Sequence, residues 1–153
     1  MELTDALLGE HAVIYELFDQ LRETVRNSND IADIRRACAT VEKVILSHAR
    51  IEDELLFPSL EPHLGPMGPL AVMRAEHQEI DESLEALRSE TDVAALKGAI
   101  GQFLALAAGH FQKEEMVLFG MTRQCLDESK LQELGQEWGT RRSVDLSGSA
   151  GAA

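Results

Sequence analysis

The sequence predicts an all-α protein: an antiparallel, up-down-up-down four-helix bundle with a short C-terminal fifth helix. Apolar residues make up 44% of the 153 residues and aromatic residues only 5%, which suits a helical bundle better than a sheet. Four long stretches space their apolar residues along one face of a helix, and short polar or proline-containing segments separate them. One motif also occurs twice, at His48–Pro58 and at His110–Gly120, each time with a glutamate four residues after the histidine.

The first helix is predicted from an N-cap at Thr4 or Asp5 to about Asn27. A short polar loop follows, and Asp30 at its end is a suitable cap for the second helix. That helix is expected to be disrupted at Pro58, because proline lacks the N–H that a helix interior needs.

Residues 59–66 contain proline and glycine and are expected to form a loop or a ragged extra turn. Pro69 is well placed as the first residue of the third helix, which is predicted to continue to about Glu90. Asp92 is the expected cap of the fourth helix, which runs to about Met121.

A short fifth helix is predicted from about Asp127 to Thr140, where Trp138 can pack across the bundle. The bundle and this helix form one domain over residues 1–142, a size that can bury a proper core. The remaining residues, 143–153, are expected to be a disordered tail, because glycine, serine and alanine dominate them.

Charge and composition exclude several classes of partner. The net charge of −13 argues against binding to nucleic acid or to an anionic membrane surface, since both repel a polyanion. No apolar run approaches the roughly 20 residues of a membrane span, and no signal peptide is visible. The two cysteines, Cys38 and Cys125, suggest no disulfide framework, so a cytoplasmic location is expected.

Four of the five histidines lie on the inward apolar stripes, one on each long helix. Counting residues from the connecting loops places them at roughly one level, with the poorest match between the third and fourth helices. Each is followed four residues later, on the same helix face, by a side chain that can bind a metal or hydrogen-bond near one. The pairs are His11 with Tyr15, His48 with Glu52, His77 with Asp81, and His110 with Glu114.

This cluster points to a metal site. Any one of these histidines, taken alone, is more simply a hydrogen-bonded core residue. Four buried imidazoles with three carboxylates would be a costly set of unpaired polar groups unless a cation joined them. Facing helices that offer such nitrogen and oxygen donors are typical of first-row metal sites.

The pattern resembles the hemerythrin-like (HHE cation-binding) family over roughly residues 5–121. The features it shares are the lone histidine of the first helix, His-x3-Glu before Leu-Phe-Pro, Glu-His in the third helix, and His-x3-Glu-Glu. The resemblance implies a non-haem centre of two iron ions per chain, bridged by carboxylates and by an oxo or hydroxo group. It further implies His11 and His48 on one iron, His77 and His110 on the other, and Glu52 and Glu114 as bridges.

Two acidic neighbours of the bridges are expected to matter less. Glu115 is turned about 100° from Glu114 and is the weaker candidate bridge, although oxygen-carrying relatives place this carboxylate at the corresponding position. Asp53 is turned by the same angle from Glu52 and is expected to point away from the site.

The sequence departs from the oxygen-carrying relatives at Asp81, where those proteins have a histidine. Asp81 is predicted to be a metal ligand; the alternative is a supporting or surface carboxylate. An additional anionic donor favours the ferric state, which makes simple oxygen carriage less suitable. Tyr15, one turn after His11, is either an ordinary core aromatic or a residue whose hydroxyl contacts or binds the iron.

The sequence therefore predicts a cytoplasmic non-haem di-iron protein that reacts with a small oxidant: hydrogen peroxide, dioxygen or nitric oxide. Catalase-like peroxide decomposition in oxidative or nitrosative stress is the favoured version. The alternative is a non-enzymatic sensor, store or carrier of iron, oxygen or nitric oxide, since one bundle can host many roles. Zinc or manganese would also suit such ligands, and a protein partner is not evident from the sequence.

Overall fold

The computed structural model describes residues 1–146, and every regular element within them is helical, as predicted. Two of the four long rods are built from three successive helical segments, the middle one a π-helix. The elements in chain order are α1 (Leu3–Asn27), α2 (Ile31–Ile51), η1 (Glu52–Leu56), α3 (Phe57–Leu64), α4 (Pro69–Ser89), α5 (Val93–Lys113), η2 (Glu114–Leu118), α6 (Phe119–Cys125) and α7 (Glu128–Arg142).

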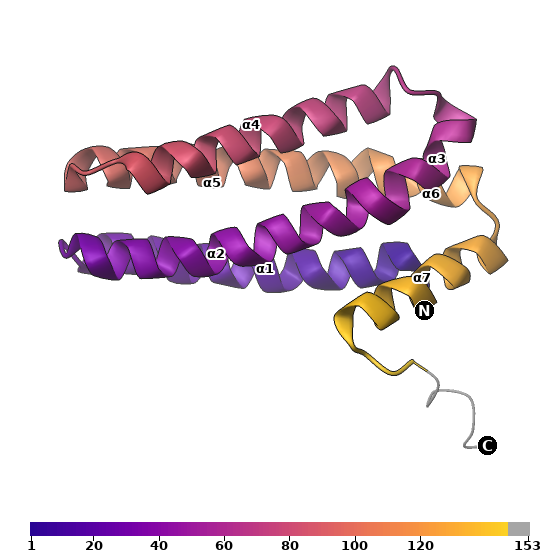
Figure 1. Ribbon diagram of the computed structural model, residues 1–153, viewed down its shortest axis with the longest axis horizontal. Coiled ribbons are helices and arrows are strands. Elements are labelled where there is room, and N and C mark those ends of the chain that lie inside the picture. Colours follow the sequence, from indigo (N-terminus) through magenta and orange to yellow (C-terminus); the bar gives the residue numbers. More distant parts are fainter. Residues whose placement is uncertain (147–153) are drawn as a thin grey trace.

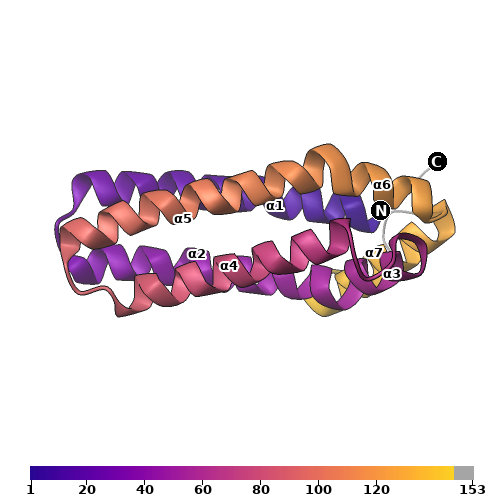
Figure 2. The same ribbon diagram turned by 90° about the horizontal axis from the view of Figure 1, so that it is seen from above.

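The four long rods lie side by side, and consecutive rods run in opposite directions (Figures 1 and 2). Contacts join α1 to α2, α2 to α4, α4 to α5, and α5 back to α1, so the four rods enclose a shared interior. The short helix α7 crosses the end of this array and packs against α1, as Figure 1 shows.

The predicted helix caps are largely confirmed. Asp30, Asp92 and Asp127 each precede a helix, and each accepts a hydrogen bond of 2.8–2.9 Å from a backbone N–H of the first turn. The first helix begins earlier than predicted, at Leu3, with Glu2 at the cap position. The side chain of Leu3 is completely buried, so packing extends the helix past the expected polar cap.

The second rod does not stop at Pro58 as the sequence suggested. Pro58 lies in the first turn of α3, directly after the π-helical segment in which the N–H of Phe57 reaches back to the carbonyl of Glu52. Because a first-turn residue needs no intrahelical N–H bond, the proline is tolerated and the rod continues. The chain turns instead at Gly65 and Gly68, which have φ values of 72° and 75°.

Apolar side chains form two separate clusters along the rods, with a polar layer between them. On α1, Leu7 belongs to the cluster near α3, α6 and α7, whereas Ile14 belongs to the cluster near the other end. His11 lies between these two residues and is 1% exposed. The fold therefore surrounds a buried polar layer with apolar packing on both sides.

The predicted tail lies mostly outside the described residues, which end at Leu146. The described part of the tail caps the C-terminal end of α7. Ser143 adopts a left-handed conformation, and the N–H of Val144 donates a hydrogen bond of 2.8 Å to the carbonyl of Gly139. By length and composition alone, the stretch Val93–Cys125 is apolar enough to cross a membrane, a test that core helices also pass.

Candidate metal centre

Six of the seven predicted ligands meet in the polar layer. Their donor atoms form two groups, and within each group the atoms lie within 4.8 Å of one another. Glu52 and Glu114 belong to both groups, and both are completely buried. The two pairs of histidines complete the groups: His11 with His48, and His77 with His110.

Each shared glutamate is the first residue of a π-helical segment. The segments η1 and η2 make i→i+5 hydrogen bonds, as from the N–H of Phe119 to the carbonyl of Glu114. Such wider turns are rare in proteins and occur mostly as single turns at functional sites. They lie where the second and fourth rods bring their carboxylates into the interior.

Each of the four histidines also bonds to a carboxylate through its other ring nitrogen, Nδ1. These carboxylates surround the six inner side chains and come from neighbouring rods. The contacts join His11 to Glu115 (2.8 Å), His48 to Glu10 (2.7 Å), His77 to Asp53 (3.1 Å), and His110 to Glu76 (2.9 Å).

These outer contacts prepare the inner nitrogens to bind a cation. A carboxylate accepts hydrogen bonds and donates none, so each ring donates its Nδ1–H outward, and a neutral ring then presents an Nε2 lone pair to the centre. The Nε2 atoms of His11 and His48 lie only 3.1 Å apart. Two lone pairs that face each other at this distance repel unless a proton or a metal ion lies between them.

The inner atoms fit a metal. Both oxygens of Glu52 and of Glu114, and the Nε2 atoms of His77 and His110, are buried with no hydrogen-bond partner among residues 1–146. The histidine Nε2 atoms lie 3.1–3.5 Å from the nearest of these glutamate oxygens. Two ligands bound at about 2.1 Å to one ion, at angles between about 90° and 109°, lie roughly 3.0–3.4 Å apart.

The arrangement is internally repeated: the first rod corresponds to the third, and the second rod corresponds to the fourth. Even the N-caps Asp30 and Asp92 and the two π-helical segments correspond. The matching site residues are His11 and His77, His48 and His110, Glu52 and Glu114, Glu10 and Glu76, and Asp53 and Glu115.

Asp81, the seventh predicted ligand, lies outside both donor groups and is exposed. A residue four positions after His77 is rotated about 40° past it, and here that rotation carries the side chain to the surface. Ile80, at the third position, is 3% exposed and takes the place toward the core.

Tyr15 contacts the outer layer of the site. Its hydroxyl donates a hydrogen bond of 3.2 Å to Glu115, the carboxylate that holds His11. Burial and the neighbouring charge of Glu115 raise the pKa of Tyr15 to about 12, so the phenol keeps its proton. The carboxylate of Glu115 therefore lies between the Tyr15 hydroxyl and the inner ligand His11.

The prediction that Asp53 points away from the site was wrong. It is turned away from Glu52, but that direction faces α4, where it meets the ring of His77. Sequence reasoning also missed Glu10 and Glu76 as partners of histidines. The signal was present, because each outer carboxylate is adjacent in the sequence to a residue of the inner set.

Charges in the site raise the pKa values of His48, His77 and His110 and so favour their positively charged forms when no cation is bound. Burial opposes the charged form of His48, but Glu52 and Glu10 outweigh it and raise its pKa to about 10. The pKa of His77 also rises to about 10, because Asp53 and Glu52 outweigh its burial. Burial likewise opposes the charge of Glu52, yet His48 and His77 hold its pKa well below the usual range. A metal ion must therefore displace protons from this site.

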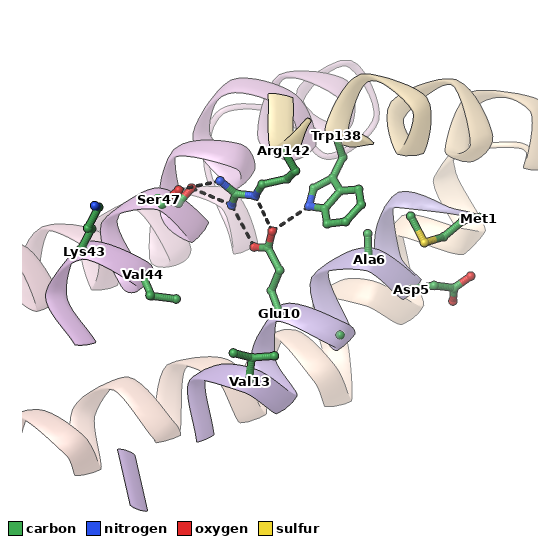
Figure 3. A pocket seen from close by; sticks show the side chains of 11 residues that line it. Met1, Asp5, Ala6, Glu10, Val13, Lys43, Val44, Ser47, Trp138 and Arg142 are labelled. Carbon is green, nitrogen blue, oxygen red and sulfur yellow. Dashed lines mark hydrogen bonds and ion pairs between the residues drawn. The ribbon is translucent and has the colours of Figure 1, made fainter. Parts of the chain in front are cut away.

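Glu10 connects the site to α7 (Figure 3). Besides His48, its carboxylate accepts hydrogen bonds from Trp138 Nε1 at 2.7 Å and from Arg142 Nε at 2.6 Å. Burial would raise the pKa of Glu10, but its contacts with His48, Arg142 and Trp138 lower it to about 2. A surface pocket of about 540 Å³ lies beside these residues, between α1, α2 and α7.

The fold and the site define a helical domain that binds cations through buried histidines and carboxylates. A family model described as the hemerythrin HHE cation binding domain matches residues 2–121. The chain therefore belongs to the hemerythrin HHE cation-binding family.

The chain is also similar to parts of longer proteins. It is 24% identical over 144 residues to a DNA nickase of Nostoc sp., covering 94% of this chain and 40% of the nickase. It is 32% identical over 83 residues to the iron-sulfur cluster repair protein YtfE of Enterobacter sp. strain 638, covering 50% of this chain and 38% of that protein. YtfE of Escherichia coli O157:H7 is 30% identical over 86 residues, or 48% of this chain and 39% of YtfE. The chain thus spans about two fifths of these relatives, and no solved structure matches it.

Proposed function

We propose that this four-helix bundle holds two iron ions that share Glu52 and Glu114 and react with a small oxidant. The observation that carries the proposal is that both glutamates belong to both donor groups. Two adjacent ions with shared carboxylates account for this overlap, whereas one ion would leave one histidine pair unused. Imidazole and carboxylate donors together suit iron.

Hydrogen peroxide is the favoured reactant, with dioxygen and nitric oxide as related possibilities. When bound, the iron pair supplies one-electron chemistry and sites for a small ligand. The protein contributes by holding the imidazoles through their outer carboxylates and by excluding bulk water, since the six inner residues are 0–8% exposed. Such a buried site suits a substrate as small as peroxide in the cytoplasm.

The relatives support part of this proposal. The similarity to YtfE, named as an iron-sulfur cluster repair protein, favours a role connected with iron and stress. The similarity to a DNA nickase covers nearly all of this chain at lower identity. A net charge of −13 opposes binding to DNA, so we do not extend that activity to this protein.

The direct test is peroxide decomposition by the iron-loaded protein, measured as evolved oxygen. We expect turnover well above that of free iron, and we expect His48→Ala to abolish it. His63→Ala is the matched control, because His63 is exposed and outside the site. Turnover no higher than that of free iron, in protein shown to contain the metal, would contradict the peroxide proposal.

The second candidate is a sensor of iron, oxygen or nitric oxide without turnover. The bonds that join His48, Glu10 and the two α7 residues favour it, because they connect the centre to a surface helix. Hydrogen exchange of the α7 amides, measured before and after nitric oxide is added, tests this role. Changed protection in a protein without turnover supports sensing, and unchanged protection argues against it.

A further inference from the structure

The two halves of the centre have matching ligands but different walls. At corresponding positions in the two halves of the chain, Phe111 follows His110 but Ala49 follows His48. Where Tyr15 lies one turn after His11, Asp81 lies one turn after His77. Because the surrounding frame repeats, these two differences show which side of the centre is closed and which is open.

The side next to His11 is closed by aromatic rings. The ring centroid of Phe111 lies 4.4 Å from that of His11 and 6.0 Å from that of Tyr15. Tyr15 also bonds to Glu115, so phenol and carboxylate cover the outer edge of the histidine. His11 and Phe111 are each only 1% exposed.

The side next to His77 is more open. Ala49 is small where Phe111 is large, and a cavity of about 10 Å³ lies beside it, lined by residues of α2, α4 and α5 that include Phe111 itself. Three ligand histidines, His48, His77 and His110, line it together with Ala49 and Asp81. A volume of this order holds about one water molecule.

Exposure of the side chains agrees with this difference between the halves. His77 is 8% exposed, against 1% for its counterpart His11. Its carboxylate partner Asp53 has a side chain 48% exposed, against 29% for Glu115. The His77 half is therefore the more exposed of the two.

We propose that this cavity is the entrance by which small ligands reach the centre, and that Ala49 and Asp81 select them by size and charge. The inference rests on the proposed function, since it concerns ligands of a bound metal pair. Ala49 keeps the passage wide enough for a molecule of two or a few atoms. The carboxylate of Asp81, which lines the cavity, and that of Asp53, which holds His77, disfavour anions, so the entrance favours neutral ligands such as peroxide and nitric oxide.

Filling the cavity tests the route. Nitric oxide association with the iron-loaded ferrous protein is followed by stopped-flow absorption, which requires no turnover. We expect Ala49→Leu to slow association by about tenfold or more, because ligands must then wait for the packed wall to open. Ala49→Val, a smaller step, should slow it less, and it keeps the test usable if the leucine variant does not fold.

Ala37→Leu is the matched control, since Ala37 is also half-buried on α2 but does not line the cavity. It should leave the association rate unchanged. Equal rates in wild type and both Ala49 variants, at equal iron content, would overturn the route. Equal slowing by Ala37→Leu would also overturn it, because the effect would then not belong to the cavity.

Removing the charge tests the selectivity. We expect Asp81→Asn to speed association of azide, an anion, with the ferric protein by roughly two- to tenfold at low salt, and less at high salt. Nitric oxide, which is neutral, should associate at an unchanged rate. An azide rate unaffected by Asp81→Asn would contradict the role of this residue.

The entrance and the proposed reaction fail in different ways. If wild type binds nitric oxide rapidly and Ala49→Leu slows it, while peroxide is not decomposed, the reaction is wrong and the entrance stands. If wild type decomposes peroxide and Ala49→Leu changes neither rate, the entrance is wrong and the reaction stands.

Discussion

At the scale of single residues, the centre depends on histidines held from both sides. Each ring faces the inner carboxylates with Nε2 and an outer carboxylate with Nδ1. The outer bond fixes both the ring orientation and the nitrogen that carries the proton. Affinity for the metal should therefore depend on residues that never touch it.

Glu10 gives the clearest test of this dependence. Glu10→Gln keeps the size of the side chain but removes the charge that holds the His48 Nδ1–H. We expect metal affinity, measured by competition with a chelator, to fall about 10- to 100-fold. Asp5→Asn is the control on the same helix, since Asp5 is exposed and outside the site. Unchanged affinity in Glu10→Gln would show that the outer bond does not support the ligand.

The shifted pKa values predict how the metal-free protein responds to pH. His48 and His77 each rise from 6.5 to about 10, so their contribution to stability is fully present below pH 6.5 and is lost as pH rises to about 10. Melting temperatures of metal-free protein should therefore decline across this range. The same protons compete with metal, so affinity should increase with pH. Affinity that falls between pH 6.5 and 10 would contradict this assignment.

The inner ligands could be predicted from the sequence because they share helix faces and recur in a repeated motif. The outer ones were harder to predict, because their role depends on which neighbouring rod they face. Asp53 is turned away from Glu52 and still reaches His77. Asp81 is one turn from His77 and still lies at the surface. Spacing along one helix cannot settle either case, since the packing of two helices decides them.

At the scale of elements, α7 is the part of the fold that joins the surface to the centre. It packs on α1 and holds Glu10 through Trp138 and Arg142. Its close approach depends on Gly135, where an added Cβ would overlap the backbone carbonyl of Met1. The position of α7 is thus set by a residue without a side chain.

Gly135→Ala should displace α7 and lower the free energy of unfolding by about 1–3 kcal/mol, as overpacking commonly does. Gly98→Ala is the matched control, because Gly98 is also within a helix but, among residues 1–146, nothing lies within 4 Å of an added Cβ. It should stabilise the protein by about 0.5–1 kcal/mol through helix propensity. Urea unfolding measures both changes. Equal effects of the two substitutions would argue against the close contact at Gly135.

Helices were predictable as elements, but their interruptions were not. Caps such as Asp30 and Asp92 are local signals and appear where the sequence indicated. The π-helical segments at Glu52 and Glu114 carry no propensity signal, because they depend on contacts made in the folded interior. Pro58 was misjudged for the same reason, since it follows such a segment and begins a new helix.

At the scale of the whole molecule, a buried polar layer separates two apolar clusters. Without a cation, this layer holds glutamate oxygens that lack hydrogen-bond partners within the described chain. Such groups cost free energy that a bound metal recovers. The molecule should therefore be most stable as the metal-bound form.

Removing the metal with a chelator should lower the thermal midpoint substantially. A ligand that binds only the folded state adds about 4 kcal/mol when its free concentration is roughly a thousand times Kd. Restoring iron should return the midpoint, and it should not do so in His110→Ala to the same extent. A midpoint insensitive to both treatments would show that the polar layer is stable without a cation.

The most direct test is anomalous diffraction at the iron edge from crystals of the iron-loaded protein. We expect two peaks per chain, both adjacent to Glu52 and Glu114, one beside His11 and His48 and the other beside His77 and His110. A single peak, or iron bound away from these two glutamates, would contradict it.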